Sequence, residues 1–127
     1  MGKIKRHHLS LGTWGEEYAA YYLEQKGYTI LSRNIRTPFG EIDLLARQNP
    51  EGNLVFVEVK TRATKKYGPP EISVTRRKQE HLIASISSYF QEHPEIEESW
   101  RVDIIAVEKP DSRETPTITH FENVIQV

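Results

Sequence analysis

Residues 55–62 (VFVEVKTR) constrain this chain most, because they have the alternating pattern of a buried β-strand and yet carry charges at inner positions. Strand side chains alternate between the two faces of a sheet, so the three valines lie on one face, while Phe56, Glu58 and Lys60 lie on the other. An unpaired charge buried in a protein interior is strongly destabilising. We therefore expect a neighbouring charge or a bound cation to stabilise this strand.

A second acidic strand is expected directly before this one. Residues 40–46 (GEIDLLA) alternate in the same way and place Glu41 and Asp43 on one face. Between the two segments, residues 49–52 have proline at the second position and glycine at the fourth, which favours a type I turn. The two strands should therefore form an antiparallel hairpin.

The turn also predicts the register of the hairpin, in which Asp43 lies opposite Glu58 with Cβ atoms about 4.5–5.5 Å apart. Two carboxylates at about 5 Å repel by roughly 3 kcal/mol at an effective dielectric of about 20, so Lys60 or a bound cation is needed beside them. A slip by one residue would send the two acids to opposite faces. The same register leaves two interpretations of Glu41, a further acid of the site or a simple cross-strand partner of Lys60.

Composition is that of an ordinary globular protein. The chain has 127 residues, 37% hydrophobic and 28% charged, which predicts a single domain over residues 1–127. No apolar run approaches the ~18–20 residues of a membrane span, and the basic stretch 1–10 is expected to be a flexible arm rather than a signal peptide. Cysteine is absent, which excludes disulfides and thiolate chemistry. We expect a cytoplasmic protein that does not contact a membrane.

The net charge of −1 conceals an uneven distribution. Basic residues cluster between positions 60 and 81, whereas residues 92–98 are acidic. A local basic surface indicates an anionic partner such as nucleic acid, although a solvated helix face is an equally good interpretation of residues 76–78 alone. The residues expected to contact phosphates are Arg62, Lys65, Lys66, Arg76, Arg77 and Lys78.

Hydrophobic periodicity outlines an α/β domain. Apolar residues recur at helical spacing before Gly27, which is typical of the residue after a helix, and again between Thr75, a good N-cap, and Pro94. The expected elements are a helix at 12–26, strands at 28–35, 40–46 and 55–62, a helix at 75–91, and strands at 100–108 and 116–127. This order, αβββαββ, predicts a mixed sheet flanked by helices, with the second helix as a crossover.

Asp43, Glu58 and Lys60 form a set suited to phosphodiester hydrolysis. Mg²⁺ is commonly bound by one or two carboxylates together with water and phosphate, and the two acids supply these on adjacent strands. The main-chain carbonyl of Val59 is a further possible oxygen ligand. A bound Mg²⁺ or Mn²⁺ would activate water, and Lys60 would orient that water or stabilise the developing negative charge.

Two further acids have competing interpretations. Glu16 lies toward the apolar side of the first helix, unlike Glu17, so it can face the interior, although a surface acid is the simpler interpretation. Asp103 interrupts an apolar strand beside Arg101, which favours a paired acid at a strand edge. The five histidines show no spacing typical of a zinc site.

The motifs at 40–46 and 55–62 resemble those of the uncharacterised bacterial YraN family, and through it those of the PD-(D/E)XK nuclease superfamily and of archaeal Holliday junction resolvases. Glu58-x-Lys60 alone is a weak signal, but its pairing with Gly-Glu-x-Asp at this separation is specific. The likeness covers nearly the whole chain. Further matching positions are Gly15, Glu16, Ala19, Leu23, Gly27, Tyr28, Asn34, 73–75, Lys78 and 101–103.

This resemblance implies a restriction-endonuclease-like fold and a role for each matching residue. Asp43 and Glu58 would bind the metal, Lys60 would be the catalytic lysine, and Glu16 would complete the site. Ile42 stands where the superfamily motif has proline, a position that varies among relatives.

The resulting hypothesis is a Mg²⁺- or Mn²⁺-dependent endonuclease that acts on DNA, with branched, Holliday junction-like DNA as one candidate substrate. Resolvase-like relatives act as dimers, which implies a homodimer by analogy. Two alternatives stay open. One is a nucleic-acid-binding module of the same fold without catalysis, and the other is a structural or protein-interaction domain in which Glu58 and Lys60 are merely neutralised strand charges.

Overall fold

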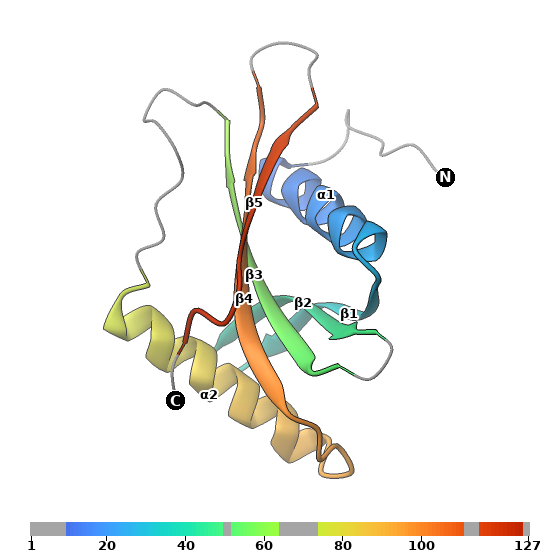
Figure 1. Cartoon of the computed structure of the whole chain (residues 1–127). Coiled ribbons are helices and arrows are strands. Elements are labelled where there is room, and N and C mark those ends of the chain that lie inside the picture. Colours follow the sequence, from blue (N-terminus) through green and yellow to red (C-terminus); the bar gives the residue numbers. More distant parts are fainter. Residues whose placement is uncertain (1–9, 50–51, 64–73, 111–114, 126–127) are drawn as a thin grey trace.

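The structure, a computed structural model, describes residues 10–49, 52–63, 74–110 and 115–125. The observed order is the predicted αβββαββ (Figure 1). Neither helix in these residues is long and apolar enough to cross a membrane. The elements are α1 (Leu11–Gln25), β1 (Tyr28–Thr37), β2 (Gly40–Gln48), β3 (Leu54–Arg62), α2 (Arg76–Glu92), β4 (Trp100–Glu108) and β5 (Thr117–Phe121).

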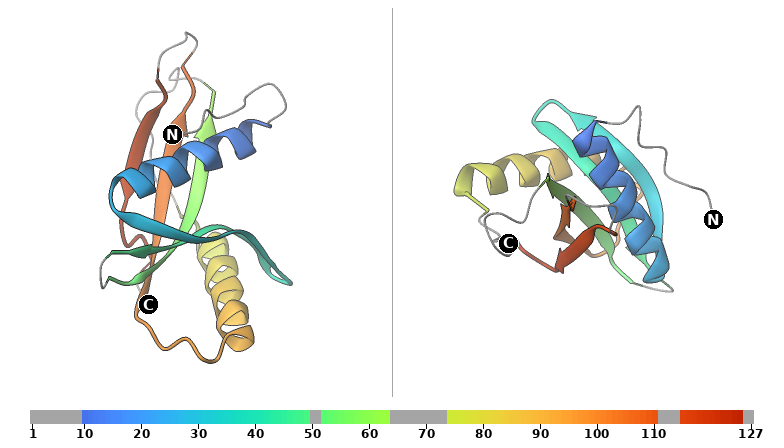
Figure 2. Two further views of the ribbon diagram at one scale, coloured as in Figure 1. Left: turned by 90° about the vertical axis from the view of Figure 1, so that its right-hand side faces the viewer. Right: turned by 90° about the horizontal axis from the view of Figure 1, so that it is seen from above.

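The strands form one mixed sheet in the order β1-β2-β3-β4-β5. Strands β3 and β4 are parallel, while the other neighbouring pairs are antiparallel. A parallel pair needs a crossover connection, and α2 provides it, as predicted. The helices pack on opposite faces of the sheet (Figure 2).

Each helix buries its apolar stripe in a separate core. On one face, α1 packs Trp14 and Leu23 against valines of β3 and apolar residues of β2 and β4. On the other, α2 packs Leu82 and Ile86 around Phe56. The first four residues of β3 are therefore buried on both faces, and burial decreases from Glu58 onward. Burial of each large apolar side chain is worth roughly 1.5–3 kcal/mol, so this half of β3 anchors the sheet.

The helix ends follow the sequence signals. Thr75 is the N-cap of α2 and its hydroxyl accepts a hydrogen bond from Lys78 N at 3.1 Å, as predicted. Ser10 caps α1 in the same way, by accepting from Thr13 N at 3.2 Å. Gly27 has a φ of 93°, the left-handed conformation expected after a helix.

The predicted hairpin register is confirmed over four pairs, including Leu45 opposite Phe56. The regular pairing ends at Leu44 opposite Val57, one residue before the predicted pair of acids. Beyond this point the Asp43 side chain takes over, because its Oδ2 accepts a hydrogen bond from Val59 N at 2.8 Å. The strands thus separate where the acidic residues begin. The predicted turn at 49–52 lies partly outside the described residues.

Asp103 is a paired acid, but the prediction of a strand edge is wrong. It lies on β4, between β3 and β5, and has no exposed surface. Its carboxylate accepts from Arg101 Nε at 2.9 Å and from Asn123 N at 2.9 Å, and lies 2.7 Å from His120 Nε2. These partners hold the pKa of Asp103 below its ordinary value despite burial, with the His120 and Arg101 side-chain hydrogen bonds as the main opposing causes. This acid therefore has a structural role.

A glycine sets the distance between α1 and the sheet. Gly15 is buried against β3, and a Cβ atom at this position would overlap the Thr61 side chain. The next residue in the helix is Glu16. The close approach of α1 to β3 therefore also fixes where the Glu16 carboxylate can reach.

We predict that Gly15→Ala lowers the free energy of unfolding by about 1–3 kcal/mol, because the added methyl forces the helix away from β3. Gly12→Ala is the matched control, since a Cβ at Gly12 meets nothing within 4 Å and alanine favours a helix over glycine. Urea unfolding of both variants checks this. Equal stability of the two would contradict the close packing at Gly15.

Candidate functional site

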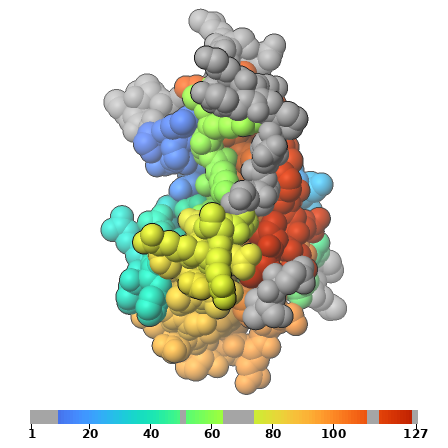
Figure 3. Space-filling view, turned by 90° about the vertical axis from the view of Figure 1, so that its left-hand side faces the viewer, coloured from blue at the N-terminus to red at the C-terminus, as the bar shows by residue number. Residues whose placement is uncertain are grey.

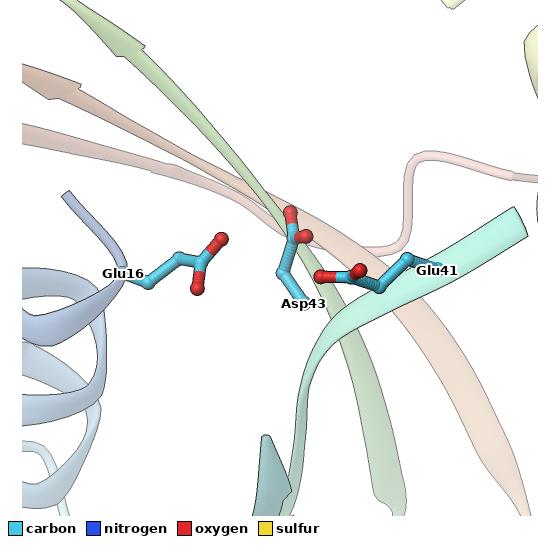
Figure 4. A group of neighbouring side chains, drawn as sticks. All are labelled: Glu16, Glu41 and Asp43. Carbon is cyan, nitrogen blue, oxygen red and sulfur yellow. The ribbon is translucent and has the colours of Figure 1, made fainter. Parts of the chain in front are cut away.

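Three carboxylates from two elements converge at the point where β2 leaves β3. Glu16 comes from α1, and Glu41 and Asp43 come from β2. One carboxylate oxygen of each lies within 4.8 Å of the others. Figure 4 shows Glu16 and Glu41 approaching Asp43 from opposite sides. The structure thus brings together the predicted Glu16 and Asp43, and it favours the interpretation of Glu41 as an acid of the site.

Asp43 is held in place by the main chain of β3. Its Oδ2 accepts from Val59 N, so the N–H of Val59 points toward β2. Within a β-strand the N–H and C=O of one residue point to the same side. The Val59 carbonyl, predicted as a metal ligand, therefore lies on the Asp43 side of β3.

Asn34 on β1 completes the cluster, although it was not among the predicted site residues. Its side-chain nitrogen, in the orientation that satisfies both neighbours, donates to Glu16 Oε1 and to Glu41 Oε1, each at 2.9 Å. Glu41 also lies 3.8 Å from Arg36, and this cation, not Lys60, is its ion-pair partner. The only sequence signal for Asn34 was its place among the positions that resemble the YraN family.

Burial and repulsion between carboxylates raise the pKa values of Glu16 and Asp43. Desolvation, followed by the charges of Asp43, Glu41 and Glu17, raises the pKa of Glu16 to about 7, against a smaller lowering by Arg33. Desolvation also raises the pKa of Asp43 to about 6, with added repulsion from Glu58 and Glu41. The hydrogen bond from Val59 and the charge of Lys78 oppose that rise. Such a site favours protons or a cation.

Glu58 lies beside this cluster, near enough for its charge to raise the pKa of Asp43. It forms an ion pair with Lys78 of α2, and its side chain is only 12% exposed. Its Oε2 atom is buried and accepts no hydrogen bond from the described residues. Glu58 therefore presents one satisfied and one unsatisfied oxygen at the edge of the acidic cluster.

The predicted basic residues differ in their exposure and in their ion-pair partners. Lys60 is exposed on β3. Arg62 forms an ion pair at 2.7 Å with Glu108, which is buried. Arg76 and Arg77 are exposed at the start of α2, where Arg76 has a long 3.6 Å pair with Glu80. Lys65 and Lys66 lie outside the described residues.

The surface is indented beside the β1–β2 hairpin. In Figure 3, α1 (blue) and the β1–β2 hairpin (teal) are separated by a hollow in front of β3 (green), with α2 (yellow) below. A pocket adjoins Glu41 and Phe39 on the hairpin and Lys78 and His81 on α2. Phe39 is 54% exposed. One carboxylate, one ammonium group, an imidazole and an exposed aromatic ring thus line this pocket.

Comparison with known proteins places this chain in a family. Residues 15–107 match the uncharacterised protein family UPF0102. The chain belongs to this family. UPF0102 is the YraN family that the acidic motifs resemble, so that expectation is confirmed.

Relatives in several organisms match this chain over most of their length. A UPF0102 protein of Trichlorobacter lovleyi is 39% identical over 127 residues, which are 100% of this chain and 98% of the relative. A second, THEYE_A1950 of Thermodesulfovibrio yellowstonii, is 42% identical over 116 residues, 91% of this chain and 95% of the relative. The similarity to both relatives thus covers almost the full length of each chain.

Two solved structures are similar at a lower level. One is Hjc, a Holliday junction resolvase from Archaeoglobus fulgidus, with a TM-score of 0.45 and 15% identity over 87% of this chain and 86% of that one. The other is a repair endonuclease from Pyrococcus abyssi, with a TM-score of 0.45 and 15% identity over 85% of this chain and 42% of that one.

We predict that the metal-free protein loses stability as the pH rises through the raised pKa values. Glu16 and Asp43 have pKa values of about 7 and about 6 in the folded protein, against 4.5 and 3.8 as ordinary values. Protonation of these two carboxyl groups therefore favours the folded state. Their contribution to the free energy of unfolding is fully present below about pH 4 and is lost by about pH 8. Thermal unfolding in EDTA should show a Tm that falls between pH 5 and pH 8.

Glu16→Gln should flatten this decline, because its side chain no longer ionises. Glu24→Gln is the control, since Glu24 is an exposed acid of the same helix and lies outside the cluster. A Glu16→Gln protein that followed the wild-type curve would show that Glu16 does not carry the raised pKa.

Proposed function

We propose that this chain is a metal-dependent endonuclease that hydrolyses phosphodiester bonds in DNA, with branched DNA as the candidate substrate. The observation that carries the proposal is the convergence of Glu16, Glu41 and Asp43 where β2 leaves β3. Membership of UPF0102 assigns no activity, because the family is uncharacterised. The motif resemblance to PD-(D/E)XK nucleases supports the reaction class.

The donor set fits a hard divalent cation. Mg²⁺ and Mn²⁺ prefer carboxylate and carbonyl oxygens, and the site offers three clustered carboxylates, of which Glu16 and Asp43 have raised pKa values. Glu58 Oε2, a buried acceptor without a hydrogen bond from the described residues, is a further free ligand atom. We propose that Asp43, Glu58 and the Val59 carbonyl hold the metal, with Glu16 completing the site.

A bound Mg²⁺ or Mn²⁺ would supply an activated water and would neutralise charge on the phosphate. The side chains around it have separate tasks. Asp43 is oriented by Val59 N, so its second oxygen keeps a fixed direction. Lys60, two residues beyond Glu58 and exposed, is in a position to meet the phosphate from solvent.

Charge around the site supports a nucleic-acid partner. The start of α2 carries Arg76 and Arg77 in solvent, with Lys78 directed to Glu58. Cations beside an acidic metal site are the arrangement that phosphate contacts require. We propose that these arginines, with Lys65 and Lys66 of the preceding segment, bind the DNA backbone, and that a homodimer binds both strands.

A non-catalytic nucleic-acid-binding module is the second candidate. The observation in its favour is the ion pair of Lys78 with Glu58, which neutralises one of the predicted metal ligands without a metal. This candidate needs the cations but not the carboxylates, so carboxylate substitutions separate it from the nuclease.

We predict that Asp43→Asn and Glu58→Gln abolish cleavage while DNA affinity stays equal or increases, because each change removes negative charge near the phosphate. The measurement is cleavage and binding of a labelled four-way junction, a flap, a single strand and a linear duplex with Mg²⁺ or Mn²⁺. Glu24→Gln should cleave like the wild type. DNA binding by the wild type without cleavage of any substrate under either metal would favour the second candidate.

We also predict that Arg76→Ala with Arg77→Ala weakens DNA binding and reduces its salt dependence. The slope of log K against log salt is negative, and each lost phosphate contact should reduce its magnitude by about 0.9. Arg47→Ala is the matched control, because Arg47 is held by Glu98 at 2.6 Å. An unchanged slope in the double variant would place the DNA-binding surface elsewhere.

A further inference from the structure

Asn34 has an unusual backbone for its position. It lies within β1, yet its φ is 51°, and the only other non-glycine residue of the described chain with a positive φ is Asn123. Asparagine tolerates this left-handed conformation better than most residues, but a strand does not call for it. Asn34 is itself exposed, so no packing in the core explains the conformation.

The register shows what the conformation achieves. Arg33 pairs with Leu44 and Ile35 pairs with Ile42, so Asn34 stands opposite Asp43. From there its carboxamide reaches Glu16 on α1 and Glu41 on β2. Local backbone strain that is retained without a packing reason is typical of functional sites.

The carboxamide has the chemistry that two converging carboxylates need. Its nitrogen carries two hydrogens, and each is given to one acid, to Glu16 Oε1 and to Glu41 Oε1 at 2.9 Å. Each glutamate keeps its second oxygen for another partner. A neutral double donor holds the two side chains side by side. A lysine or arginine in its place would instead compete with a metal cation for the two carboxylates.

We propose that Asn34 is a positioning residue of the metal site, whose left-handed backbone directs its carboxamide between Glu16 and Glu41 and so orients these carboxylates toward a divalent cation. This inference rests on the proposed function, because it requires that the cluster binds a metal. Groups that orient metal ligands in this way typically contribute 10- to 100-fold to metal affinity.

The left-handed backbone allows a clean substitution. Glycine adopts a positive φ without strain, so Asn34→Gly removes the carboxamide and keeps the strand geometry. Asn123→Gly is the matched control, since Asn123 has a φ of 53°, contacts Asp103 through its main-chain N–H and is not part of the cluster of Glu16, Glu41 and Asp43. Thermal unfolding in EDTA verifies that both variants fold.

The test is Mn²⁺ binding to the full chain, measured by calorimetry for the wild type, Asn34→Gly and Asn123→Gly. We expect Asn34→Gly to bind Mn²⁺ about 10-fold more weakly, while Asn123→Gly retains the wild-type Kd. Cleavage by Asn34→Gly should recover as Mn²⁺ is raised, since all ligands are intact, whereas Asp43→Asn should not recover.

Equal Mn²⁺ affinity in the wild type and Asn34→Gly would overturn the positioning role and leave the proposed function standing. Equal weakening in both glycine variants would also overturn it, because the effect would then belong to the backbone. Absence of Mn²⁺ binding by the wild type would contradict the proposed metal site and, with it, this inference.

Discussion

The hydrogen bond from Val59 N to Asp43 determines the architecture of this site. Strands β2 and β3 pair regularly up to Leu44 and Val57, and there the ladder ends. A side chain then replaces a main-chain acceptor, because Asp43 Oδ2 accepts from Val59 N at 2.8 Å. This exchange lets the start of β2 turn away from β3 toward α2, where Gly40 and Glu41 lie beside Lys78, and the N–H of Val59 stays satisfied. It also directs a partly buried carboxylate into the space that opens.

Where the strands separate, carboxylates lie close together, and neighbouring side chains offset their mutual repulsion only in part. Glu16, Glu41 and Asp43 lie together, with Glu58 near enough to act on Asp43. The described side chains offset this with one neutral donor, Asn34, with a long ion pair to Arg36 and with Lys78 on Glu58. The raised pKa values of Glu16 and Asp43 reflect burial first, and then the repulsion that these groups leave uncompensated. A divalent cation would remove it.

Most of the fold follows from local signals in the sequence. Alternation, turn residues and helix caps predicted the order of elements, and the turn predicted the hairpin register up to Leu44. The end of that register could not be predicted, because it depends on a side chain that bonds to the main chain of another strand. The position of Asn34 was hidden for a related reason. Nothing in its neighbours indicates a left-handed residue in a strand, and its partners come from α1 and β2.

The central claim is that the carboxylates around Asp43 bind a divalent metal. The most direct measurement is a crystal structure of the protein with Mn²⁺, in which anomalous scattering locates the ion. We expect a peak at about 2.0–2.2 Å from an Asp43 carboxylate oxygen, with Glu16 or Glu58 among the remaining ligands. A fully soaked crystal without a peak at this cluster, and with Glu58 still paired to Lys78, would contradict it.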